Sequence, residues 1–224
     1  MKKKRISIKK ICDTLGHSVP YQKKLYNFKS KKWSKIRMNS IQTHILGSQM
    51  KKKSLYPSQQ WYKYRLNAKQ KVKGEFGFIK DQQLRKLFKQ PNTGIDNNSL
   101  NTIQMLESRL DLILYRMGFA ESLFKAHQLI NHGFIFVNGI KTYSKSFNVK
   151  KGDFIEINPR YWDSVFKEVH SRFENNSIFM PAPKYLEINY KLLMGILLEN
   201  PTYSDLHYFA PMDIKSAKDF YTRG

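Results

Sequence analysis

The sequence predicts an α+β protein in which short helices pack on a small antiparallel sheet. Apolar residues recur at helical spacing through residues 106–117, and after Gly133 the pattern changes to that of strands. The charge points to a partner rather than to a fold. Lys and Arg number 40 against 17 Asp and Glu, a formal net charge of +23. Such an excess is typical of proteins that bind nucleic acid or an anionic membrane.

Residues 1–54 form a basic extension with interleaved aromatic residues. Residues 1–74 hold 21 of the 40 Lys and Arg residues but a single acid, Asp13. Lysines neutralise phosphates and aromatic rings stack on bases, so we expect this extension to bind RNA. A targeting peptide is the alternative, although its basic residues would more often be arginine. The lysines expected to contact RNA here are Lys31, Lys32, Lys51, Lys52 and Lys53.

Residues 55–99 are predicted to be a helical region that ends in a turn-rich linker, PNTGIDNNS at 91–99. Within it, a lysine-rich run at 69–73 precedes a helix that contains Gln83-Leu84-Arg85. Four cations of this region are expected to contact RNA: Lys69, Lys71, Lys73 and Arg85.

The central segment begins with a helix predicted to run unbroken to Gly118. Its apolar stripe consists of Leu106, Leu110, Ile113, Leu114 and Met117. Arg109 and Arg116 share a different face, where we expect them to meet phosphate. Glu107 and Asp111 lie one turn apart, but no nucleophile accompanies them. An ion pair of Asp111 with a neighbouring arginine, or support of the helix dipole near the N-terminus, is therefore favoured over acid–base chemistry.

A second helix, a hairpin and a closing strand follow. Ser122 is the expected N-cap, the segment ends at Gly133, and its buried side would contain Ala126, Leu129 and Ile130. Residues 134–137 favour a strand, Asn138-Gly139 is a strong hairpin signal, and a turn at 150–153 leads into a strand at 154–157. Seven residues here are expected to contact RNA: Lys125, His127, His132, Lys141, Lys145, Lys150 and Lys151.

The order of these elements resembles the S-four RNA-binding domain. The matching residues are Leu106, Glu107, Arg109, Leu110, Asp111, Gly118, Ala126, Gln128, Leu129, His132, Gly133, Val137, Asn138, Gly139, Val149, Gly152, Asp153 and Ile155. Two positions depart from the family, because Leu123 and His127 stand where it carries arginine. Both His127 and His132 are expected to contact RNA and to lack a nearby acidic partner that would suggest catalysis.

The flanking segments resemble the ribosomal protein family that gives this domain its name. The residues that carry the likeness are Leu66, Lys69-Gln70-Lys71, Phe76-Gly77, Gln83-Leu84-Arg85, Tyr185-Leu186-Glu187, Gly195, Pro201, Asp205-Leu206 and Phe220-Tyr221-Thr222-Arg223. The resemblance covers residues 55–224. It implies an RNA-binding domain at 100–157, inserted into a helical domain of residues 55–99 and 158–224 that the C-terminal tail closes.

The resemblance implies a structural constituent of the small ribosomal subunit. Such a protein binds and organises small-subunit rRNA, acts early in assembly and lies near the path by which mRNA enters. Its other implied partners are neighbouring ribosomal proteins, with mRNA as a further one. No membrane partner, small-molecule substrate, cofactor or metal is expected. The single cysteine, Cys12, excludes an internal disulfide and a cysteine-cluster zinc site.

Two other functions were weighed against this one. A free-standing RNA-binding chaperone would be shorter and would lack the C-terminal likeness. An RNA-modifying enzyme would need a catalytic domain, for which the chain has neither the motif nor the length. The protein is therefore not expected to be an enzyme.

Composition suggests the compartment. Lysine outnumbers arginine 31 to 9, which indicates an A/T-rich genome. A mitochondrial ribosome in the matrix fits this usage best, with a bacterial cytoplasm or a plastid as alternatives.

Overall fold

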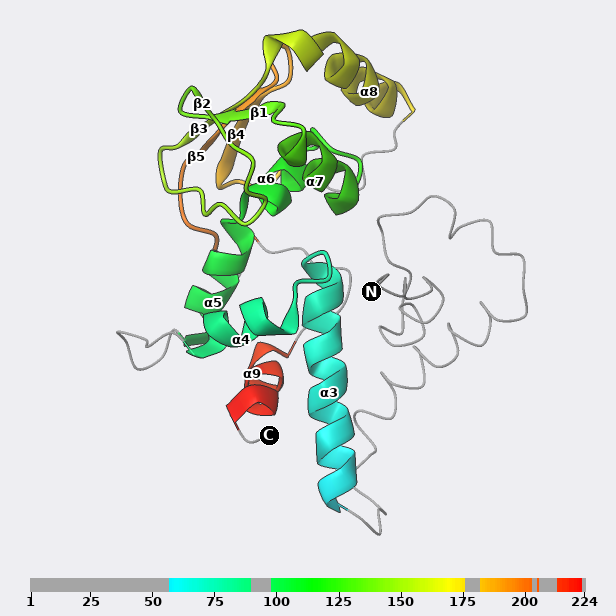
Figure 1. Cartoon of the computed structure of the whole chain (residues 1–224), viewed down its shortest axis with the longest axis vertical. Coiled ribbons are helices and arrows are strands. Elements are labelled where there is room, and N and C mark those ends of the chain that lie inside the picture. Colours follow the sequence, from blue (N-terminus) through cyan, green and yellow to red (C-terminus); the bar gives the residue numbers. More distant parts are fainter. Residues whose placement is uncertain (1–56, 90–97, 176–181, 203–204, 206–212, 223–224) are drawn as a thin grey trace, which may run out of the picture. The chain divides into compact units, whose positions relative to one another are not determined.

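The computed structural model describes residues 57–89, 98–175, 182–202, 205 and 213–222 (Figure 1). The chain divides into two compact units, one of residues 1–90 with 208–224 and one of residues 91–207. We call these the helical unit and the sheet unit. The predicted basic extension at 1–54, with its five candidate lysines, lies outside the described residues.

The helical unit is built from two segments at opposite ends of the chain. Its helices are α3 (Pro57–Glu75), α4 (Asp81–Lys89) and α9 (Ile214–Thr222). Helix α9 packs on α3 (Figure 1). The Tyr64 hydroxyl donates to Asp213 at 3.0 Å, and the Tyr221 hydroxyl donates to Asp81 at 2.9 Å. The predicted closure of this unit by the C-terminal tail is thus confirmed.

The sheet unit contains all the described strands. They are β1 (Ile135–Val137), β2 (Ile140–Lys141), β3 (Phe154–Ile157), β4 (Leu186–Asn189) and β5 (Met194–Leu197). The five form one sheet in the order β2-β1-β3-β5-β4, and every neighbouring pair is antiparallel. The unit's helices are α5 (Asn98–Glu107), α6 (Leu110–Arg116), α7 (Leu123–Asn131) and α8 (Trp162–Glu174), the last preceded by a 3₁₀ turn, η2 (Pro159–Tyr161).

The helix ends, the helix cap and the strand pattern predicted for this unit are confirmed. Gly118 and Gly133 end their helices with φ of +74° and +69°, a conformation that glycine adopts without steric cost. The Ser122 hydroxyl accepts a hydrogen bond from Lys125 N and caps α7. Strand β3 alternates between half-buried and buried residues, as expected for a strand with one face on the core. Ile155 and Ile157 of that strand belong to the main hydrophobic cluster, with Leu114 and Ile130 of the helices.

The prediction of one unbroken helix through residues 106–117 is wrong. Helix α5 ends at Glu107, and Arg109 has extended backbone angles (φ −68°, ψ 135°) at the N-cap of α6. The backbone leaves the helix because it pairs with a distant loop. Leu110 N donates to Phe147 O and Val149 N donates to Ser108 O, both at 2.8 Å.

The predicted domain boundary at residue 158 is also wrong. Residues 158–207 belong to the sheet unit, because β5 pairs with β3 and β4 pairs with β5. The return to the helical unit begins only at residue 208. The sequence analysis did not predict β4 and β5.

Candidate nucleic-acid interface

Arg109 lies in a buried ion pair. Its Nε and Nη2 donate to the two carboxylate oxygens of Asp111 at 3.1 and 2.7 Å. His127 completes the cluster, with Nε2 2.8 Å from Asp111 Oδ2, so the expectation that His127 lacks an acidic partner is wrong. Burial alone would raise the pKa of Asp111, but the hydrogen bonds from His127 and Arg109 outweigh it and hold the pKa below its usual value. The predicted pairing of Asp111 with an arginine is confirmed.

Arg116 lies in a second buried ion pair. Its Nε and Nη2 donate to Glu107 at 3.2 and 2.9 Å, and the Tyr185 hydroxyl donates to the same carboxylate at 3.2 Å. The Glu107 side chain has no exposed surface. Burial and the adjacent carboxylate raise the pKa of Tyr185, so this phenol stays protonated. The cluster joins α5 and α6 to the start of β4.

The expectation that Arg109 and Arg116 share an open, RNA-facing side is therefore corrected. Their side chains are 8% and 6% exposed, and each guanidinium is already bound by a carboxylate. A charged side chain with so little exposure is tolerated only when an opposite charge pairs with it, and each of these two arginines has such a partner. Both arginines stabilise the fold from which other cations project, and their own contact with RNA stays a prediction.

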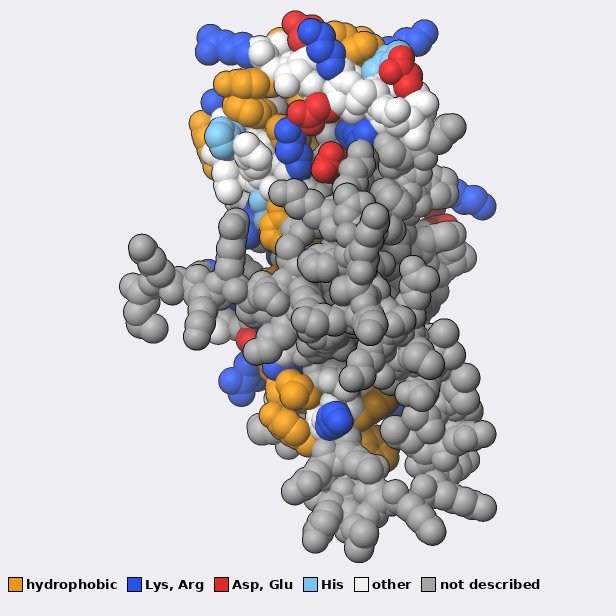
Figure 2. All heavy atoms as spheres, turned by 90° about the vertical axis from the view of Figure 1, so that its right-hand side faces the viewer, with side chains coloured by type: hydrophobic (Ala, Val, Ile, Leu, Met, Phe, Trp, Pro, Cys, Tyr) orange, Lys and Arg blue, Asp and Glu red, His pale blue; other side chains and the backbone are white. Residues whose placement is uncertain are grey.

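The predicted contact residues of the sheet unit that are exposed lie at the end of α7, on the hairpin, in the loop that follows and on the turn before β3. They are His132, Lys141, Lys145, Lys150 and Lys151. None of them forms an ion pair with another described residue. On the face shown in Figure 2, the residues coloured by type mix lysine and arginine with acidic, histidine and hydrophobic side chains. The cations there form no uniform basic patch.

A hydrogen-bonded scaffold fixes the turn that carries Lys150 and Lys151. Asn138 donates to Asp153 at 2.9 Å through its side-chain amide and accepts from Phe154 N at 2.8 Å. Lys150 N donates to Asp153 at 2.7 Å. The hairpin turn and the second turn are thus tied together, so the lysines start from a rigid backbone. Cations on such a backbone lose less freedom when they bind phosphate.

Several other predicted contact residues have protein partners. The Lys125 ammonium lies 2.8 Å from Glu168, and His127 belongs to the Asp111 cluster. In the helical unit, Lys69 and Lys73 lie 3.4 and 2.9 Å from Asp81. The Lys69 ammonium also lies 4.0 Å from the Phe220 ring centroid, a cation–π contact between α3 and α9. RNA contact by these residues stays a prediction, as it does for the half-buried Lys71.

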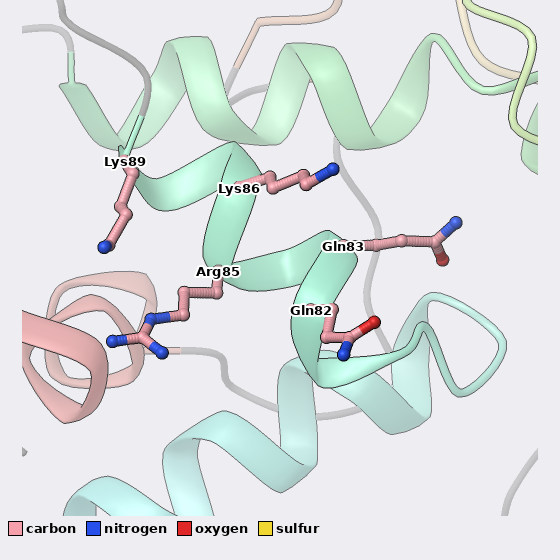
Figure 3. A pocket seen from close by; sticks show the side chains of 5 residues that line it. All are labelled: Gln82, Gln83, Arg85, Lys86 and Lys89. Atoms are coloured by element: carbon pink, nitrogen blue, oxygen red, sulfur yellow. The ribbon is translucent and has the colours of Figure 1, made fainter.

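Arg85 is more open and has two cationic neighbours that the sequence analysis missed. Arg85, Lys86 and Lys89 line an open pocket beside α4 together with Gln82 and Gln83 (Figure 3). No ion pair within the described part of the chain engages these three cations. The signal was present in the sequence, because residues at i, i+1 and i+4 of an amphipathic helix with Leu84 and Phe88 buried must face solvent.

No described helix is long and apolar enough to cross a membrane. Within the same residues, no three His, Cys, Asp or Glu side chains lie where they could hold a metal ion.

Comparison with known proteins gives consistent matches. The S4 domain family matches residues 108–155. The protein named small ribosomal subunit protein uS4 from Allorhizobium ampelinum is 34% identical over 159 residues, which are 70% of this chain and 75% of that protein. The protein of the same name from Rhodospirillum centenum is 36% identical over 162 residues, 72% and 78% of the two chains. That from Bartonella bacilliformis is 33% identical over 162 residues, 72% and 77%.

Proposed function

Because the chain belongs to the family of small ribosomal subunit protein uS4, we propose that it is a structural constituent of the small ribosomal subunit and binds and organises its rRNA. The observation that supports this most is the extent of the similarity. It covers 70–72% of the chain, whereas an RNA-modifying enzyme with an S4 appendage would share little beyond residues 108–155. An early role in assembly and a position near the path of incoming mRNA belong to the same proposal.

Eight exposed cations are the proposed phosphate contacts. In the sheet unit they are His132, Lys141, Lys145, Lys150 and Lys151, and in the helical unit Arg85, Lys86 and Lys89. Contacts of this kind position a protein on folded RNA without reading its bases. They suit double-helical RNA, which proteins recognise largely by shape and through sugar and phosphate.

Charge-matched variants test the sheet-unit contacts. One variant carries Lys145→Gln, Lys150→Gln and Lys151→Gln, and the control carries Lys167→Gln, Lys184→Gln and Lys191→Gln, three exposed lysines outside the proposed set. Each lost phosphate contact lowers the slope of log affinity against log salt by about 0.7–0.9. We expect the first variant's slope on small-subunit rRNA to fall by about 2–3, with little change in the control. Equal slopes for both variants would remove these lysines from the interface.

The extension is tested in the same way. Deletion of residues 1–54 should lower the salt slope, because fewer counterions are then released. A slope equal to that of the full chain would exclude the extension from the contact.

Ultraviolet crosslinking in native cells tests the function itself. Crosslinks clustered on small-subunit rRNA, from protein that sediments with the small subunit, support the proposal. Crosslinks spread over tRNA, large-subunit rRNA or many mRNAs would favour a chaperone or a modifying enzyme. We further propose a mitochondrial ribosome as the location, supported by the lysine-rich composition. The bacterial relatives are also compatible with a bacterial cytoplasm, and subcellular fractionation distinguishes the two.

A further inference from the structure

Aromatic side chains gather where the helix α7–β1 connection meets the start of α8. The Phe134 and Tyr161 rings are stacked, with centroids 3.3 Å apart and planes 22° apart. The His132 ring also contacts Phe134, with centroids 5.3 Å apart and planes tilted by 53°. Phe134 is half-buried, whereas His132 and Tyr161 are exposed.

The backbone brings these residues together from distant parts of the sequence. Asn158 N donates to Phe134 O at 2.8 Å, which places the end of β3 beside the start of β1. The Asn158 side chain then accepts from Arg160 N at 3.0 Å and caps the 3₁₀ turn η2. That turn sets Tyr161 against Phe134 and leaves the neighbouring Arg160 exposed.

A fourth ring comes from the hairpin. Thr142 N donates to Ile135 O at 3.0 Å, which directs the chain back past Gly133. A Cβ atom at Gly133 would lie 2.7 Å from Tyr143 Cε1 and would also collide with the Lys141 side chain. Glycine thus allows both side chains to lie directly against the segment that links His132 to Phe134. The Lys141 ammonium lies 5.3 Å from the Tyr143 ring centroid.

We call His132, Phe134, Tyr143 and Tyr161 the aromatic platform. It is open, since Tyr143 is 58% exposed and Tyr161 is 39% exposed. Two cations flank it, Lys141 and Arg160, and neither forms an ion pair with any described residue. Exposed rings beside unpaired cations match the chemistry of a single nucleotide, which offers a flat base and a phosphate on either side.

We propose that the aromatic platform stacks an unpaired base of the bound RNA while Lys141 and Arg160 hold the adjacent phosphates. This inference rests on the proposed rRNA-binding function and adds to it, because phosphate contacts alone do not distinguish paired from unpaired RNA. Every base presents a π face, so the platform selects an unpaired nucleotide, such as a bulge, without selecting its sequence.

The test compares two RNAs with the full-length protein. One is a perfect duplex of about 16 base pairs, and the other is the same duplex with one unpaired 2-aminopurine. Wild-type protein should bind the bulged RNA about fivefold or more tightly than the duplex, and at saturation it should quench the 2-aminopurine fluorescence. Tyr143→Ala and Tyr161→Ala should each lose most of this preference and quenching while binding the perfect duplex as before.

Two controls separate stacking from other effects. Tyr143→Phe keeps the ring and should retain both signals. Phe173→Ala removes an aromatic side chain of α8 that is 44% exposed and outside the platform, and it should also retain them. Thermal unfolding of each variant shows whether it is folded. If Tyr161→Ala is unfolded, the comparison relies on Tyr143→Ala, because Tyr143 is the more exposed of the two.

The outcomes distinguish this inference from the proposed function. If wild-type protein binds both RNAs equally and without quenching, or if both alanine variants keep the preference, the platform does not stack a base. In that case the rRNA-binding function still stands, and the platform is assigned as a contact surface for a neighbouring protein. If wild-type protein binds neither these RNAs nor small-subunit rRNA, the proposed function itself fails.

Discussion

Two ion pairs flank the junction between α5 and α6, and each ties one arginine to one carboxylate. Glu107 with Arg116 and Asp111 with Arg109 are both nearly excluded from solvent. A buried pair contributes little net stability compared with apolar residues of the same volume. Removing one partner is costly, because it leaves the other charge buried and unpaired. These pairs therefore make the junction intolerant of single substitutions.

Substitution of Arg116 should show this asymmetry. In Arg116→Met the Glu107 carboxylate, which has no exposed surface, loses the guanidinium and keeps the hydrogen bond from the Tyr185 hydroxyl. We expect the free energy of unfolding in urea to fall by about 3–5 kcal/mol. The double variant Glu107→Gln/Arg116→Met should recover part of that loss, since a neutral amide still accepts from Tyr185. A double variant no more stable than Arg116→Met would contradict this account.

Asp111 should make the stability of the sheet unit depend on pH. Its pKa in the folded state lies below the unfolded value of 3.8, so the folded state binds the proton less readily. The stabilisation is fully present above pH 3.8 and disappears as the pH falls through the folded-state pKa. Urea unfolding between pH 6 and pH 2.5 measures this loss (roughly the range in which an aspartate titrates).

Asp111→Asn is the control for that measurement. The variant should be less stable near neutral pH, because Arg109 loses its carboxylate, and it should show a shallower fall in stability below pH 3.8. The same slope in both proteins would assign the acid sensitivity to other carboxylates, such as Asp81, whose pKa is also lowered by Lys73 and Tyr221 against the opposing effect of burial.

At the scale of secondary structure, β5 approaches α6 at a glycine. A Cβ atom at Gly195 would lie 2.6 Å from Met117 Cε and 3.2 Å from the Glu187 carbonyl oxygen. Met117 is fully buried, and the Glu187 oxygen belongs to the neighbouring strand β4, so neither atom moves away freely. The absence of a side chain at Gly195 therefore lets β5 pack closely against Met117, the residue that follows α6.

Gly195→Ala should destabilise the sheet unit by about 1–3 kcal/mol, the usual cost of overpacking a core. A double-mutant cycle with Met117→Ala measures the contact itself by chemical denaturation. The cost of the Gly195 substitution should be smaller in the Met117→Ala background, because the colliding side chain is gone. Equal costs in both backgrounds would show that the steric contact lies elsewhere.

The elements that could be predicted are those with local signals. Ser122, Asn138-Gly139 and the glycines that end helices define α7, the hairpin and the turn before β3 without reference to distant residues. Strands β4 and β5 have no such signal, since Leu193 adopts a positive φ of 51° at their connection where glycine or asparagine would be expected. The break at Arg109 also depends on pairing with residues 147–149, which lie far along the chain.

At the scale of the whole molecule, the charge predicted the class of partner but not the contact residues. Lysines and arginines with similar sequence surroundings differ in how far they are exposed to solvent. Arg109 and Lys69 are buried, whereas Lys150 and Arg85 are exposed. Burial depends on tertiary packing, which composition does not encode. The aromatic platform escaped prediction for the same reason, because β1 and η2 meet only in the fold.

The two units should respond differently to loss of the C-terminus. Deletion of residues 208–224 removes α9, which packs on α3, together with the hydrogen bond from Tyr221 to Asp81. We expect amide hydrogen exchange in α3 and α4 to rise strongly while protection in the sheet unit is retained. Tyr221→Phe, which removes only the hydrogen bond, should have a small effect. Loss of protection in both units would show that they unfold together.

The division of the helical unit between the two ends of the chain also governs the order of events during synthesis. A nascent chain emerges from its N-terminus, so α3 and α4 leave the ribosome first but wait for α9, which is made last. The intervening sheet unit is complete roughly ten seconds of elongation after α4 and can fold in that interval. Every chain that terminates before α9 therefore carries an open helical unit, and only a chain that includes α9 can close it.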